Sequence, residues 1–290
     1  MPTNCHLSSP TVAALSMRGA QRAALWFVVL VARCCTCAGE WVARPSMPTA
    51  RRQLSVDMRT DSTLFAVGGS TPSLTSVNEV YTASTSTWEA MAPMPTVRKA
   101  LVCRFVDDFL FAVGGCCPVA STGQLVEIFS PATSTWTTGP SMPTGRNNMA
   151  AAVSGNSKLY VIGGKTTSVV VGTLELYRTT TGQWSSLPSM PTARYGHGAD
   201  TYGSELFVAG GVDGDSSIID VLEKYSIPSS TWSTAPAMPT ARMWLGTVTA
   251  GTTGAHTVPP ARPLPACVLH LSCARGGPAF LVRSEKSVRY

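Results

Sequence analysis

The chain has 290 residues, of which 44% are apolar, so it can bury a sizeable core and is not disordered throughout. The formal net charge is +6. Residues 45–250 carry thirteen Lys and Arg against fourteen Asp and Glu, so the basic excess lies at the two ends, which argues against a folded nucleic-acid-binding surface and gives no reason to expect a nucleic-acid partner.

The first 38 residues form a leader that differs from the rest of the chain. Arg18 and Arg22 precede an apolar run at residues 23–32, which has the length of a signal-peptide core and is short for a membrane span. Arg33, directly behind the run, argues against a signal. The leader is therefore a signal peptide, a disordered leader, or an uncleaved anchor at residues 18–38 that would give membrane contact. A signal would place the protein in the secretory pathway or outside the cell; otherwise we expect it in the cytoplasm.

A repeat of about 48 residues occupies the chain from about residue 41 to residue 250. The triplet Met-Pro-Thr returns five times, and an arginine stands four residues after its methionine each time. A glutamate, an aromatic residue and a tryptophan return in register in four copies. The arginines are Arg51, Arg98, Arg146, Arg194 and Arg242; the glutamates Glu79, Glu127, Glu175 and Glu223; the aromatic residues Tyr81, Phe129, Tyr177 and Tyr225; and the tryptophans Trp88, Trp136, Trp184 and Trp232. A fixed period of this length indicates a repeat architecture.

Each repeat reads as a series of short strands. In the third copy, small residues at 149–154 come first, and the apolar run 158–162 follows and ends at a glycine pair. Residues 174–177 then alternate in polarity, and a turn leads to the tryptophan segment. Five-residue apolar runs without a 3.6-residue period are typical of buried strands. Four short strands, the innermost with small side chains and the outermost with tryptophan, are the proportions of one blade of a β-propeller.

These landmarks resemble the kelch repeat, in which a hydrophobic run closed by Gly-Gly is followed by a spaced Tyr and Trp and then by Met-Pro and Arg. The resemblance covers about 210 of the 290 residues. It implies an all-β, kelch-type β-propeller over residues 39–250, with four complete four-stranded blades whose loops form binding surfaces.

We expect the two ends of the repeat region to share an incomplete fifth blade. Trp41 enters the ring as an outer strand, and residues 238–250 supply one more inner strand. The glycine pair expected near residue 258 is replaced by Pro259 and Pro260, which cannot serve a central strand. Residues 251–290 match no repeat and are predicted to be a poorly ordered tail. An incomplete ring could also be closed by oligomerisation.

Cysteines do not build this fold. Nine are present, three of them inside the repeats, and none returns at the period. A disulfide framework would place a pair in each unit.

The repeated arginines are the first candidate binding residues. In kelch domains that bind acidic peptides, the contacts come from the loop leading into the inner strand and from the loop after Gly-Gly. The resemblance maps these contacts here onto two groups of positions: before the inner strand, Arg51 with Arg52, Arg98 with Lys99, Arg146, and Arg194 with Tyr195; after the glycine pairs, Ser70, Cys116, Lys165 and Asp213. The candidate binding residues among them are Arg98, Lys99, Arg146, Lys165, Arg194 and Tyr195. A residue present in every blade serves the blade, however, so the arginines are expected to be structural and paired with the repeated glutamates.

The residues that break the symmetry of the repeat are the better candidates for binding. They are Lys99, Lys165, Tyr195 and His197. His197 is the only histidine within the repeats, and its small neighbours favour a packed polar group over a catalyst.

The sequence therefore predicts a module that binds a protein partner through loops on one face of the propeller. The alternative is a metal-dependent or sugar-active propeller enzyme. That alternative needs several ligands to converge, whereas the other three histidines lie outside the repeats. No catalytic residue, metal site or cofactor is expected.

Overall fold

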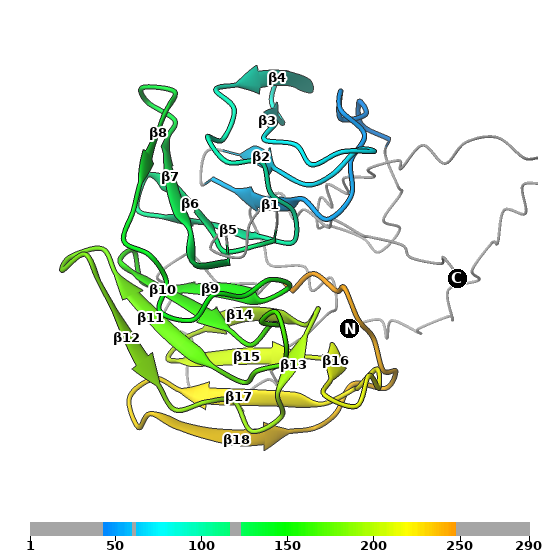
Figure 1. Ribbon diagram of the computed structural model, residues 1–290, viewed down its shortest axis with the longest axis vertical. Helices are drawn as coiled ribbons and strands as arrows, with labels where there is room; N and C mark the ends of the chain where they lie inside the picture. Colours follow the sequence, from blue (N-terminus) through cyan, green and yellow to red (C-terminus); the bar gives the residue numbers. More distant parts are fainter. Residues whose placement is uncertain (1–42, 60–61, 117–122, 248–290) are drawn as a thin grey trace, which may run out of the picture.

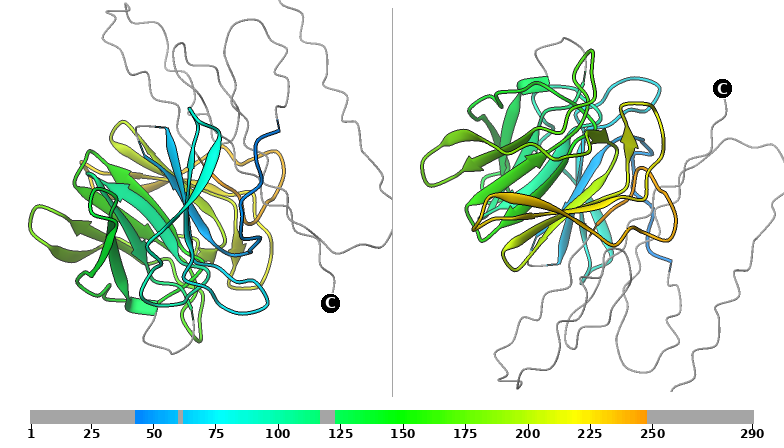
Figure 2. Two further views of the ribbon diagram at one scale, coloured as in Figure 1. Left: turned by 90° about the horizontal axis from the view of Figure 1, so that it is seen from above. Right: turned by 90° about the horizontal axis from the view of Figure 1, so that it is seen from below.

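The fold is a series of four twisted sheets arranged side by side around a common centre (Figure 1, with views from above and below in Figure 2). The computed structural model describes residues 43–59, 62–116 and 123–247. Within this part of the chain no α-helix occurs, and nothing forms a helix long and apolar enough to cross a membrane. The predictions about the leader at residues 1–38 and the tail at residues 251–290 lie outside the described residues.

Each sheet has four strands, as the repeat predicts. Blade 1 contains β1 (Ser55–Met58), β2 (Thr63–Val67), β3 (Asn78–Thr82) and β4 (Thr87–Met91). Blade 2 contains β5 (Val102–Val106), β6 (Phe109–Val113), β7 (Val126–Ser130) and β8 (Thr135–Thr138). Blade 3 contains β9 (Ala150–Ser154), β10 (Lys158–Ile162), β11 (Leu174–Arg178) and β12 (Gln183–Leu187). Blade 4 contains β14 (Gly198–Tyr202), β15 (Glu205–Ala209), β17 (Leu222–Ser226) and β18 (Thr231–Ala235).

An additional two-stranded sheet, which the sequence did not predict, lies at the edge of blade 4. It pairs β13 (Arg194–Tyr195) with β16 (Val212–Asp213). In the other blades the same contact is reduced to an isolated bridge, such as that between Arg52 and Ser70. The extra sheet is therefore a stronger form of a feature found in every blade.

The strands within each blade are antiparallel neighbours in chain order, and this register stacks the repeated aromatic residues. Tyr177 of β11 lies opposite Trp184 of β12, and their ring centroids are 5.2 Å apart. The corresponding pairs in the other blades have centroids 5.0–5.3 Å apart. Tilted aromatic pairs at this separation are favourable beyond the area that they bury.

The hydrophobic core lies between the blades rather than within them. Phe65 and Val67 of blade 1 belong to one buried cluster with Leu110 and Phe129 of blade 2, and the same kind of cluster joins each following pair of blades. The tryptophans also hydrogen-bond across the blade boundary. The indole N–H of Trp136, for example, donates to the carbonyl of Ala92 in the preceding blade at 2.8 Å. The fold therefore depends on blade-to-blade packing, as the recurring aromatic residues predicted.

Glycine pairs form the junctions near the centre. In the third repeat Gly163 and Gly164 have φ angles of +56° and +104°, a region that side chains with a Cβ rarely adopt. The amide of Gly164 donates to the carbonyl of Arg194, in the next repeat, at 2.8 Å. A Cβ on Gly163 would lie 2.7 Å from the same carbonyl oxygen. Glycine is thus required where one blade passes directly against the next.

Both ends of the described chain adopt positions that an adjacent blade would occupy. The carbonyl of Arg242 accepts a hydrogen bond from Gly211 at 2.7 Å, as the preceding arginines do from their glycine pairs. The indole N–H of Trp88 donates to the carbonyl of Pro45, which is the same kind of hydrogen bond as that between Trp136 and Ala92. The remainder of the expected fifth blade, Trp41 and the residues after 247, lies outside the described residues, so its sharing between the two ends stays a prediction.

Candidate functional site

The repeated arginines point into their own blades rather than toward a ligand. Arg98 donates to the carboxylate of Glu127 at 2.8 Å and to the carbonyls of Gly114 and Ala112. The other carboxylate oxygen of Glu127 accepts from the hydroxyl of Thr96 at 2.8 Å. The Thr and the Arg of the Met-Pro-Thr-x-Arg segment therefore both donate hydrogen bonds to the carboxylate of the repeated Glu.

This arrangement recurs in all four blades. The ion pairs join Arg51 to Glu79, Arg98 to Glu127, Arg146 to Glu175 and Arg194 to Glu223. The arginine side chains have no exposed surface, and burial lowers the pKa of each guanidinium while its glutamate partner opposes that change. Arg98, Arg146 and Arg194 were candidate binding residues from the sequence. The structure instead places them inside the blades, where they support the loops, in agreement with the structural alternative.

His197 also lies inside the molecule, directly before β14. It is 5% exposed, and its ring packs over Gly163 at the junction of blades 3 and 4. The corresponding positions in neighbouring repeats are Leu101, Met149 and Leu245. Burial, and then the charge of Arg194, lower the pKa of His197 to about 3, so the ring is neutral at physiological pH. It fills an apolar position, as the packed alternative predicted.

Lys99, Lys165 and Tyr195 remain near the surface, on a rim formed by two loops of each blade. We define the rim as the residue after each repeated arginine and the residue after each glycine pair. Its members are Arg52, Lys99, Asn147, Tyr195 and Met243, together with Ser70, Cys116, Lys165 and Val212. The two groups meet through the same backbone bridge in each of the four blades. In blade 3, Asn147 and Lys165 exchange two hydrogen bonds of 2.9 Å.

The rim keeps a constant backbone while its side chains vary. Arg52 and Lys165 are exposed and Lys99 is half-buried, and among the described residues no carboxylate lies within ion-pair distance of these three cations. The ammonium group of Lys165 lies 5.8 Å from the centre of the Tyr195 ring, so blades 3 and 4 bring two of the predicted residues together.

Apolar side chains are exposed in the same set of loops. Val97 and Met243 are each 36% exposed, Val169 is 56% exposed and Ile218 is 47% exposed. All four lie in the loops that lead into an inner strand or follow a glycine pair. The rim and its flanking loops thus combine unpaired cations with separate apolar contacts, which is the composition of a protein-binding surface.

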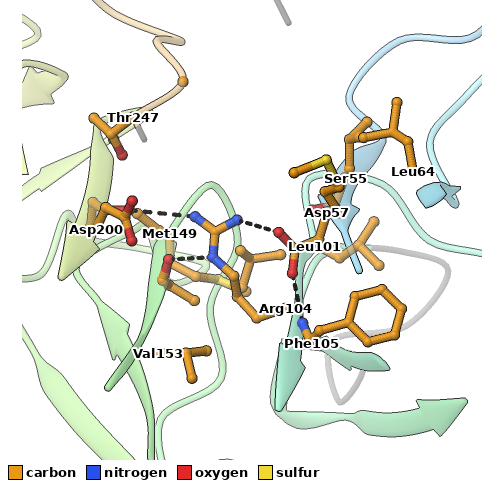
Figure 3. Close-up of a pocket in the computed structure, with 18 of the residues that line it drawn as sticks. Ser55, Asp57, Leu64, Leu101, Arg104, Phe105, Met149, Val153, Asp200 and Thr247 are labelled. Carbon is orange, nitrogen blue, oxygen red and sulfur yellow. Dashed lines mark hydrogen bonds and ion pairs between the residues drawn. The ribbon is translucent and has the colours of Figure 1, made fainter. Parts of the chain in front are cut away.

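A central cavity of about 610 Å³ is the second candidate site (Figure 3). Inner-strand residues line it, among them Asp57, Arg104 and Asp200. Sequence reasoning missed these three residues because it treated the inner strands only as runs of small side chains. The signal was present, since the three positions fall in the same phase of the 48-residue period, with Ala152 in the remaining blade.

Among the residues that the structure describes, no three His, Cys, Asp or Glu side chains lie close enough to hold a metal ion. The metal-dependent alternative therefore has no ligand set in this part of the chain.

Comparison with known proteins agrees with this architecture. The family profile for the KLHDC2/KLHL20/DRC7 Kelch-repeats domain matches residues 36–211, and the Kelch motif profile matches residues 193–239. A solved structure titled "Structure of YjhT" aligns with a TM-score of 0.63 at 16% identity, covering 73% of this chain and 78% of that one. At this identity the likeness shows the fold alone. Comparison with curated proteins finds no match.

Proposed function

Because the chain belongs to the kelch-repeat family, we propose that it is an interaction module whose rim binds a protein partner. Kelch-repeat domains generally act as protein-interaction modules. A fold does not determine function by itself, so the proposal rests on the site. The observation that carries it is the constant backbone bridge of the rim, which presents different side chains in each blade.

The charges favour a partner segment with acidic residues. Arg52, Lys99 and Lys165 lie on blades 1, 2 and 3, whereas the loop of blade 4 carries Asp213 and Asp215. An acidic segment would therefore be attracted to the side of the rim formed by blades 1 to 3 and repelled from blade 4, which favours one orientation of the bound segment. The exposed aliphatic side chains nearby supply the apolar contacts that most interfaces need.

The opposite face of the propeller is a weaker candidate. It exposes Phe109 and Tyr202, at 46% and 50%. Its cations are partly neutralised, however, since Arg59 pairs with Asp108 at 3.3 Å and Lys224 pairs with Glu205 at 2.7 Å. The rim cations Arg52, Lys99 and Lys165 have no such carboxylate partner among the described residues.

Charge reversal on each face tests the proposal. The full chain is used to capture partners in parallel with Lys165→Glu and with the matched control Lys158→Glu, which lies at the start of β10 by the opposite hairpin. We expect the captured proteins to be lost with Lys165→Glu and retained with Lys158→Glu, because a reversed charge on a binding surface costs about tenfold or more in affinity. Equal capture by both variants would contradict a rim site.

A further inference from the structure

One bulky residue, Trp244, occupies a backbone position that disfavours it. Two residues after each repeated arginine the chain has a positive φ angle, between +54° and +62°. The residues at this position are Gln53, Ala100, Asn148, Gly196 and Trp244. Glycine and asparagine tolerate this left-handed region best, whereas a large side chain rarely adopts it. Trp244 nevertheless has a φ of +56°.

A ladder of backbone hydrogen bonds holds these positions in place. From Ala100 onward, the amide of each residue donates to the carbonyl of its equivalent in the preceding repeat, as Gly196 does to Asn148 at 2.9 Å and Trp244 does to Gly196 at 2.6 Å. Only main-chain atoms take part, so the ladder imposes the same backbone whatever the side chain. Strained conformations that the surrounding structure imposes cluster at functional sites. The presence of tryptophan here therefore points to a role for its side chain.

The indole of Trp244 lies beside the rim residue Tyr195. The centroids of the two rings are 6.1 Å apart, and the ring planes meet at 66°. A Cβ on Gly196 would lie 3.3 Å from two carbons of the indole, so the lack of a side chain there makes room for it. Tyr195 and Trp244 are both half-buried. Each aromatic side chain is therefore fixed in part by packing and keeps exposed surface.

Lys165 completes a row of three side chains. Its ammonium group lies 5.8 Å from the centre of the Tyr195 ring, and no carboxylate of the described residues lies within ion-pair distance of it. The row thus offers positive charge at one end and aromatic surface at the other, which suits a partner with a carboxylate and an apolar side chain. An extended segment advances about 3.3 Å per residue, so two groups within about four residues of each other can reach both ends of the row.

We propose that Lys165, Tyr195 and Trp244 form the main contact site of the rim, and that they bind a protein segment in which an acidic residue lies close in sequence to a large apolar residue. The carboxylate pairs with Lys165, and the apolar side chain packs on Tyr195 and Trp244. Aromatic side chains that are fixed before binding lose little freedom on binding, and such residues dominate the binding energy of many interfaces. This proposal rests on the rim site proposed above and adds the main contact residues and the chemistry of the partner.

The test selects binders from a displayed library of random dodecapeptides on the full chain. We expect the enriched peptides to share an acidic residue within about four positions of a large apolar residue. A labelled synthetic peptide with the shared sequence is then titrated by fluorescence polarisation. Trp244→Asn, Tyr195→Ala and Lys165→Glu should each weaken its binding about tenfold or more. The matched control Tyr202→Ala removes a tyrosine that is 50% exposed on the opposite face, and it should leave the affinity unchanged.

Trp244→Asn also separates a binding role from a packing role. Asn148 has the equivalent position in blade 3 with a φ of +54°, so asparagine fits this backbone. The variant should therefore unfold at a temperature no lower than the wild type while its affinity for the peptide falls. A lower unfolding temperature, with or without a loss of affinity, would assign Trp244 to packing and overturn its role in binding.

The variants distinguish failure of this proposal from failure of the rim site. Peptides that lose affinity with Lys165→Glu but not with Trp244→Asn or Tyr195→Ala would overturn the proposal and leave the rim site supported. Enriched peptides that lack the acidic and apolar pair, or a library that yields none, would overturn the proposed partner chemistry. Peptides whose affinity none of the three variants changes would contradict the rim site as well.

Discussion

Removing the charge of Glu175 tests the buried ion pairs that we regard as the internal support of every blade. Its carboxylate lies 2.8 Å from Arg146, and the two side chains are 1% and 0% exposed. Its other oxygen accepts from Thr144 at 2.7 Å. Glu175→Gln preserves an acceptor for that hydroxyl but leaves the guanidinium of Arg146 buried without a counter-charge.

The cost should be a large part of the total stability. Breaking a buried pair by removing one partner destabilises by about 3–5 kcal/mol, whereas domains are stable by only ~5–15 kcal/mol. In a repeat region of this size each kcal/mol lowers the melting temperature by ~2–4 °C. Urea unfolding followed by tryptophan fluorescence measures the effect, because each blade carries one of the repeated tryptophans.

Two controls make the result specific. Glu205→Gln breaks the pair with Lys224, whose side chains are 34% and 35% exposed, and it should cost less than about 1 kcal/mol. In a double-mutant cycle, Arg146→Met combined with Glu175→Leu should be less destabilising than the sum of the single changes by ~1–3 kcal/mol. Strict additivity, or a cost for Glu175→Gln no larger than that of the exposed control, would refute the reasoning.

Three further predictions concern the junctions between blades. Trp136→Phe removes the indole donor to Ala92 and should cost about 1 kcal/mol in urea unfolding, since one hydrogen bond between blades is lost. Gly163→Ala should destabilise more than Gly182→Ala, measured by melting temperature, because both residues have positive φ but only the first meets backbone within 2.7 Å. His197 gains a proton below about pH 6.5 only in the unfolded chain, so it contributes a loss of up to ~1.4 kcal/mol of stability per pH unit from there toward pH 3. His197→Leu should remove this contribution, so the stability of the variant should fall less steeply with falling pH than that of the wild type.

The repeat could be predicted from the sequence because its landmarks perform the same physical task in every blade. The spacing of Glu175, Tyr177 and Trp184 within a repeat fixed two adjacent strands, and the glycine pairs marked where a blade meets the next. The pairing of Arg146 with Glu175 also followed from recurrence, since both are present in each copy. For His197, which breaks the repeat, the small neighbouring residues were the separate signal that favoured the packed position in which the structure places it.

The remaining features depend on contacts that recurrence does not reveal. That the indole of Trp136 reaches the preceding blade, rather than its own, follows from the geometry of packed sheets. The cross-blade contacts of Arg104 were equally hidden, because the residue type at this level of the inner strands changes from one repeat to the next. Residues that break the symmetry of a repeat must be located in space before their chemistry can be interpreted, as Lys165 and Tyr195 also show.

The central claim, that a partner binds the rim, is tested most directly by hydrogen exchange of the full chain with and without a captured partner. The account predicts slower exchange in the loops at residues 96–99, 165–170 and 212–218 when the partner is bound, with the hairpins at residues 106–109 and 154–158 unchanged. Slower exchange confined to those hairpins, with the rim loops unaffected, would contradict it.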